Sequence, residues 1–135
     1  MSEPTFHAYV RRDELPPVSE IVRAMSSRGW RVSISGVETL AEASDGALPV
    51  QVDDQDTAIT FKRLEDGKGE FDALRSELPQ HFDQETYKEV LRQMELRLSF
   101  TGDAVWAREM ARSVALLSAG AFENPQDNKL LFYGR

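Results

Sequence analysis

The side chains that could do chemistry in this sequence are mainly its 23 carboxylates and its two histidines, His7 and His81. Neither histidine is followed within four residues by another, the spacing that a zinc site usually shows, and the chain has no cysteine. Asp53, Asp54 and Asp56 could bind a hard cation, but the calcium loop needs ligands at alternate positions over twelve residues, and this segment does not continue that pattern. We therefore expect surface or sheet-face histidines, solvated turn aspartates, and no metal or other cofactor.

Several classes of enzyme would leave motifs that this sequence lacks. It contains no G-x-S-x-G, H-E-x-x-H or G-x-G-x-x-G, and Gly67-Lys68-Gly69 does not have the spacing of a phosphate-binding loop. A pair of carboxylates acts through proximity in space and needs no motif, so a small carboxylate-dependent enzyme remains an alternative. The prediction from the residues is a protein that is not an enzyme.

Length, composition and charge indicate the number of domains, the compartment, and which kinds of partner are not expected. With 135 residues, 41% of them hydrophobic, the chain is expected to form one α+β domain over 1–135. The formal net charge of −7 would repel a phosphate backbone, which argues against direct nucleic-acid binding. There is no apolar run of about 20 residues, the length needed to cross a bilayer, and no basic and apolar leader at the start. The expected location is the cytoplasm, with no membrane contact.

Acidic residues gather between positions 53 and 72. This segment carries seven carboxylates against three basic side chains; the carboxylates are Asp53, Asp54, Asp56, Glu65, Asp66, Glu70 and Asp72. Such a surface accelerates encounter with a basic protein, and an exposed tryptophan is a common anchor in protein interfaces. Because Trp106 lies off the apolar stripe of its helix, we predict that it and the seven carboxylates bind a partner protein. The alternative is that the acidic loops only keep a small domain in solution.

The elements that must position these residues begin with a strand, a helix and a second strand. Apolar and polar residues alternate over 6–10 and again over 30–34, which predicts two strands. Between them, Pro16–Arg28 has apolar residues at i, i+3, i+4 and i+7, and Gly29 is suited to end a helix. These residues predict a β-α-β-like unit, which is normally right-handed.

The middle of the chain predicts a hairpin with an acidic tip. Residues 49–52 and 57–61 have strand patterns on either side of Asp53–Asp56. The stretch before them, 37–48, has little periodicity and is expected to be a loop that could include a short helical turn at 37–43. A turn at 66–69 and a short helix over 71–78 follow.

Helical and strand spacings overlap at Met94. Apolar residues fit a helix over 87–94 and a strand over 94–100, so we place the switch near Gln93.

The last third predicts a second strand, helix and strand. Asp103 can cap a helix that runs to Ser118, and Gly120 follows its apolar, alanine-rich stripe. Residues 129–133 predict a closing strand. The expected fold is therefore α+β, a two-layer sandwich with a mainly antiparallel sheet, two β-α-β-like units, and the helices of 16–28 and 103–118 on one face.

Several short segments have a recognisable arrangement along the chain. They are Leu15-Pro16 before the first helix, Gly-Ala-Leu-Pro-Val at 46–50, the alanine-rich segment from Trp106 to Ala121, and the Glu-Asn-Pro-Gln-Asp and Tyr-Gly segments that follow it. In this layout the chain resembles small immunity-type proteins of bacterial polymorphic toxin and secreted effector systems. The resemblance implies a cytoplasmic, acidic, non-enzymatic protein that neutralises a cognate toxin by covering its active site or another essential surface. Contact residues differ between members of such families, so none is carried over.

A small-ligand-binding or regulatory α+β module stays open as another alternative. A pocket at the edge of the sheet would favour it.

Overall fold

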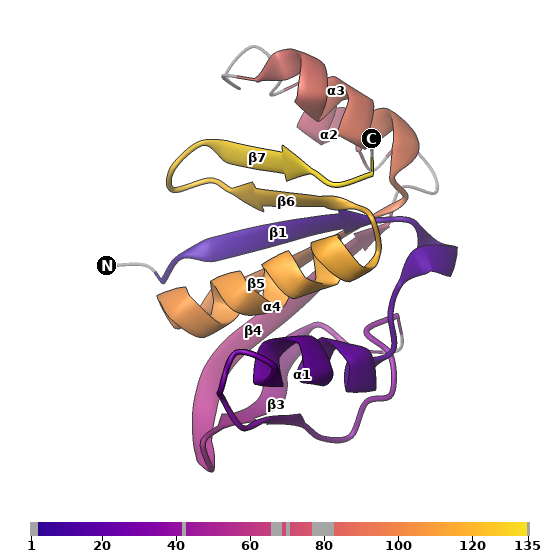
Figure 1. Cartoon of the computed structure of the whole chain (residues 1–135). Coiled ribbons are helices and arrows are strands. Elements are labelled where there is room, and N and C mark those ends of the chain that lie inside the picture. The colour runs from indigo at the N-terminus through magenta and orange to yellow at the C-terminus, as the bar shows by residue number, and fades with distance from the viewer. Residues whose placement is uncertain (1–2, 42, 66–68, 70, 77–82, 135) are drawn as a thin grey trace.

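One antiparallel sheet of seven strands organises the chain (Figure 1). A computed structural model describes residues 3–41, 43–65, 69, 71–76 and 83–134. Its strands are β1 (Thr5–Val10), β2 (Val32–Ile34), β3 (Gly46–Val52), β4 (Gln55–Glu65), β5 (Leu96–Gly102), β6 (Ala121–Asn124) and β7 (Lys129–Phe132). Its helices are α1 (Val18–Ser26), α2 (Asp72–Arg75), α3 (Gln84–Gln93) and α4 (Ala104–Leu117), with a 3-10 turn, η1, at Arg12–Glu14. The α+β class and the antiparallel sheet are as predicted.

The strands lie in the order β2-β3-β4-β5-β1-β6-β7, and all neighbours are antiparallel. Strand β1 therefore separates β5 from β6, which run in the same direction and are joined by α4. Likewise β1 and β2 run in the same direction, but three strands lie between them. The first predicted strand-helix-strand unit forms as β1, α1 and β2. The second begins as predicted with β5 and α4, but β6 closes it, and the predicted closing strand at 129–133 is β7, which pairs with β6 at the edge of the sheet.

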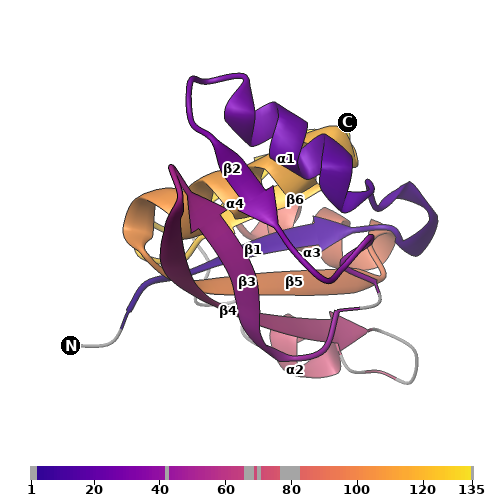
Figure 2. The ribbon, with the colours of Figure 1, turned by 90° about the horizontal axis from the view of Figure 1, so that it is seen from below.

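The larger core lies between one face of the sheet and the helices α1 and α4. Alternate residues of β1 and β5 face it, as the period of two in a strand requires. Ile21 and Met25 of α1 and Met110 and Val114 of α4 are fully buried against them, each worth about 1.5–3 kcal/mol on removal from water. Figure 2 shows α1 and α4 together on one side of the sheet. This confirms the predicted layer of helices.

A smaller apolar cluster covers part of the opposite face. It packs the buried side chain of Tyr9 against α2 and α3; its members are Tyr9, Phe71, Leu74, Tyr87, Val90, Leu91, Met94, Ala121 and Leu130. The Tyr9 hydroxyl donates a hydrogen bond to the Glu123 carboxylate at 2.7 Å. Burial and this carboxylate raise the pKa of Tyr9 well above its usual value, so the phenol stays neutral. Periodicity did not predict which face α2 and α3 would cover.

Local differences from the predicted elements have physical reasons. Residues 37–41 and 43 form the predicted loop: Thr39 pairs with Pro17, and a turn is closed by the hydrogen bond from the Ala43 N–H to the Leu40 carbonyl at 3.3 Å. Strand β6 was not predicted: it is only four residues long, and all four are buried, so it has no alternation to detect. The switch near Gln93 is confirmed, since α3 ends there and β5 begins at Leu96. Most of the predicted turn at 66–69, and Leu78, lie outside the described residues.

Helix α4 is capped at both ends by hydrogen bonds. The Asp103 carboxylate accepts from the N–H groups of Val105 (2.9 Å) and Trp106 (3.2 Å), which confirms the predicted cap. At the other end Ala119 takes the left-handed conformation (φ 53°), and the Gly120 N–H donates to the Ala115 carbonyl at 2.8 Å. A Cβ atom on Gly120 would lie 2.0 Å from the Tyr9 carbonyl oxygen, so only glycine allows the backbone after α4 to approach β1 this closely.

No helix in the described part of the chain combines the length and the apolar character that crossing a membrane requires.

His7 lies on the sheet face opposite α1 and α4, where its Nδ1 is 2.7 Å from the Ser99 hydroxyl. Burial and the positive charge of Arg97 lower the pKa of His7 to about 3. An unfolded histidine has a pKa of about 6.5, so between these two values the unfolded chain takes up a proton that the folded chain does not. The stability that the folded chain gains by keeping His7 neutral is therefore complete above pH 6.5 and is lost as the pH falls toward 3.

We expect the free energy of unfolding of the wild type to fall by about 2 kcal/mol more than that of His7→Gln between pH 7 and pH 4. This loss is smaller than the two pKa values alone would give, because the imidazole is only partly buried and solvent screens its charge. Urea unfolding followed by circular dichroism at the two pH values measures the difference. Parallel losses in the two proteins would show that His7 is not responsible.

Candidate protein-binding surface

The tip of the β3-β4 hairpin is a two-residue turn tied to the start of β2. Asp53 and Asp54 both have positive φ (52° and 67°), the pattern of a type I′ turn, which matches the twist of paired strands. The Asp53 carboxylate accepts from the Arg31 N–H at 3.1 Å, and the Asp53 N–H donates to the Arg31 carbonyl at 2.7 Å. Asp54 pairs with the Arg31 guanidinium at 3.2 Å, and both side chains are largely exposed. The predicted hairpin is confirmed, and its tip is shorter than expected.

Beside this turn lies a hollow of about 610 Å³. We call it the acidic hollow; it is lined by Glu3, Val52, Asp53, Gln55, Asp56, Thr57, Asp103 and Trp106. Half of its lining residues are carboxylates, and none of the described residues that line it is basic. Carboxylates from three separate parts of the chain therefore meet at one place, where their potentials add.

Trp106 forms one wall of the acidic hollow, and Trp30 packs against it. Its ring meets that of Trp30 edge to face, with centroids 4.6 Å apart and an interplanar angle of 89°. Trp106 is only partly buried, as predicted from its place off the helix stripe, whereas its neighbour Ala107 is fully buried. The indole thus presents a rigid aromatic surface beside four carboxylates, at little cost in side-chain entropy on binding.

The structure separates the other predicted carboxylates from this hollow. Glu65 lies at the far end of β4, roughly 30 Å away along an 11-residue strand, and pairs with Arg12 (3.4 Å) and Arg63 (3.2 Å). Asp72 on α2 pairs with Arg75 at 2.7 Å. Asp66 and Glu70 lie outside the described residues.

Sequence reasoning found Asp53, Asp56 and Trp106 but missed two members of the hollow. Asp103 was recognised only as a helix cap, a role that already explained its position. Glu3 precedes the first strand with no pattern around it. Only the folded chain brings these two carboxylates to the hairpin.

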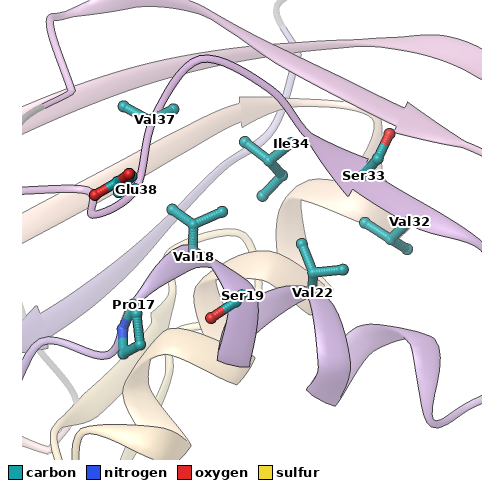
Figure 3. A pocket seen from close by; sticks show the side chains of 9 residues that line it. All are labelled: Pro17, Val18, Ser19, Val22, Val32, Ser33, Ile34, Val37 and Glu38. Carbon is teal, nitrogen blue, oxygen red and sulfur yellow. The ribbon is translucent and has the colours of Figure 1, made fainter.

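A second hollow, also of about 610 Å³, lies at the edge of the sheet between α1 and β2. We call it the edge groove; it is lined by Pro17, Val18, Ser19, Val22, Val32, Ser33, Ile34, Val37 and Glu38. Figure 3 shows the side chains of Val18 and Val22 on α1 directed toward those of Val32 and Ile34 on β2. A hydrogen bond from the Val18 N–H to the Glu38 carbonyl (2.8 Å) holds the loop at one end of the groove.

Among the described residues, no three histidine, aspartate or glutamate side chains are placed to hold a metal ion. Comparisons with protein-family models, with curated proteins and with solved structures gave no match. The acidic hollow and the edge groove are therefore the features that bear on function.

Proposed function

We propose that this protein is a non-enzymatic binding protein of the bacterial cytoplasm that neutralises a cognate toxin by direct contact, in the manner of an immunity protein. The observation that supports the proposal is the acidic hollow, in which a rigid tryptophan lies beside four carboxylates. Aromatic residues in this setting are typical anchors of protein interfaces. The arrangement suits a lysine or arginine of the partner, which would gain ion pairing and contact with the indole face.

The charge of the chain supports a basic protein as the partner. A net charge of −7 speeds encounter with a toxin domain of positive surface potential, such as one that acts on nucleic acid. Covering that surface would block access to the toxin's own substrate. A carboxylate-dependent enzyme is less well supported, because the side chains of Asp53, Asp56 and Asp103 are exposed to solvent and a general acid needs a more enclosed site.

The edge groove is the observation that favours a small-ligand module as the second candidate. It is a pocket at the sheet edge, and most of its lining is aliphatic.

Charge reversal at the acidic hollow tests the proposal. In the double variant Glu3→Lys/Asp56→Lys we expect association with the toxin encoded by the neighbouring gene to slow about tenfold at low salt and to depend less on ionic strength. Both residues are exposed, and within the described part of the chain the one hydrogen bond affected is the exposed bond from the Gln51 side chain to the Asp56 carboxylate at 2.9 Å. Stopped-flow fluorescence measures the association rate.

The matched control is Glu65→Lys/Asp72→Lys, which changes the net charge equally on a different part of the surface. Equal slowing in both double variants would mean that net charge alone, and not the hollow, steers association. Absence of binding between the wild-type protein and the toxin would remove the proposed function.

A further inference from the structure

Strand β2 forms one edge of the sheet and leaves backbone groups available. The Arg31 carbonyl accepts from the Asp53 N–H (2.7 Å), and the Ser35 N–H donates to the Pro49 carbonyl (3.1 Å), so odd-numbered residues face β3. In an antiparallel ladder the residues between them, Val32 and Ile34, direct N–H and C=O away from the partner strand. Within the described part of the chain, no backbone group bonds to these outward-facing positions. They are a template for one more strand.

The same two residues shape the groove beside that edge. Val32 and Ile34 lie two apart on the strand, so both side chains point to the face covered by α1, where Figure 3 shows them opposite Val18 and Val22. In an added antiparallel strand, the residues directly opposite Val32 and Ile34 would share this face. Two alternate apolar side chains of the added segment would therefore enter the edge groove.

Acidic groups lie at both ends of this short edge. At the start of β2, Asp53 and Asp54 together outnumber the one basic side chain there, Arg31, which pairs with Asp54 at 3.2 Å. Glu38 lines the groove beyond the end of the strand. An occupant with lysine or arginine on both sides of its apolar pair would complement this arrangement. A second copy of the chain would complement it less well. Antiparallel pairing of β2 with itself would bring the turn of each copy, with two carboxylates against the single guanidinium of Arg31, toward Glu38 of the other, and the excess negative charges repel.

We propose that β2 binds an extended segment of the partner protein as an additional antiparallel strand, with two alternate apolar side chains in the edge groove and basic residues on either side of them. This proposal rests on the proposed function, because it assigns how part of the toxin is held. It also gives the two hollows separate tasks. The acidic hollow takes a basic side chain, and the edge groove takes two apolar side chains of the extended segment that pairs with β2.

A synthetic peptide, Lys-Thr-Val-Thr-Val-Thr-Lys with blocked ends, tests the strand geometry without the toxin. Titrated into the ¹⁵N-labelled full chain, it should shift the amide resonances of Val32 and Ile34 and those of Val18 and Val22. N-methylation of the two valines should weaken binding at least tenfold, because their N–H groups face β2, whereas N-methylation of the two outer threonines should not. Replacing both lysines by glutamate should also weaken binding.

Two variants test the same edge from the protein side. Ile34→Pro removes the outward N–H and is tolerated on an edge strand, and Ile34→Ala removes the same side chain but keeps the donor. The peptide should bind Ile34→Pro at least tenfold more weakly than Ile34→Ala. The toxin should also bind Ile34→Pro more weakly than Ile34→Ala.

The outcomes separate this proposal from the proposed function. Equal binding by the parent and valine-methylated peptides, or no shifts in β2 at millimolar peptide, overturns the strand geometry; if the toxin still binds, the proposed function stands. Concentration-dependent shifts in β2 without peptide would assign the edge to a second copy. Peptide binding without toxin binding would support the edge site and remove the proposed function.

Discussion

Gly120→Ala is expected to lower the free energy of unfolding by about 3 kcal/mol, at the upper end of what one added methyl group costs in a packed site. The reason is geometric: the new Cβ would lie 2.0 Å from the backbone carbonyl oxygen of Tyr9, and a backbone atom of a central strand cannot rotate aside as a side chain can. Relief requires α4 and β1 to move apart. Equilibrium unfolding in urea measures the loss.

The adjacent residue provides a control of opposite sign. Ala119 holds a positive φ of 53°, which costs an alanine about 1 kcal/mol, so Ala119→Gly should stabilise the protein by about 0.5 kcal/mol once the added chain entropy of glycine is subtracted. If Gly120→Ala costs less than about 1 kcal/mol, the close approach of the helix end to β1 is not rigid.

Trp106→Ala is expected to weaken binding of the cognate toxin roughly 100-fold, the size of effect found for a central aromatic anchor. Most of the change should appear as faster dissociation, because the indole contributes to the docked complex more than to encounter. Surface plasmon resonance separates the two rates. The Trp30 ring would lose its edge-to-face partner, so binding should be measured well below the melting temperature of the variant.

Leu116→Ala is the matched control for Trp106→Ala. Leu116 is on the same helix, near its other end, is 49% exposed and does not line the acidic hollow, so its truncation removes an apolar side chain from the surface without changing the hollow. Its toxin binding should match the wild type. A Trp106→Ala variant that dissociates no faster than Leu116→Ala would exclude the indole as an anchor.

The elements with an unambiguous period were predictable from the sequence. The stripe of α1, the cap and stripe of α4, and the change from a period near four to a period of two around Gln93 each follow from which side chains must be buried. The β3-β4 hairpin followed from turn chemistry, since aspartate accepts positive φ more readily than most residues.

The arrangement of these elements was less predictable because it depends on contacts between distant residues. Nothing in residues 121–124 shows that they pair with β1, because the polar residues Glu123 and Asn124 are buried on opposite faces and so produce no alternation of apolar and polar residues. The acidic hollow was half predicted for the same reason: Asp53 and Asp56 are neighbours in sequence, whereas Glu3 and Asp103 reach them only through the order of strands in the sheet.

The position of β1 between β5 and β6 sets an order of events during synthesis on the ribosome. Both neighbours of β1 come from residues 96–124, so this strand leaves the exit tunnel long before either partner exists. Until then its apolar residues Phe6, Ala8 and Val10 have no sheet to join, and α1 has no α4 beside it. The nascent chain therefore presents an unpaired apolar strand to which a chaperone could bind. β1 gains its second neighbour only after Asn124 has been made, and the sheet is complete only with Phe132.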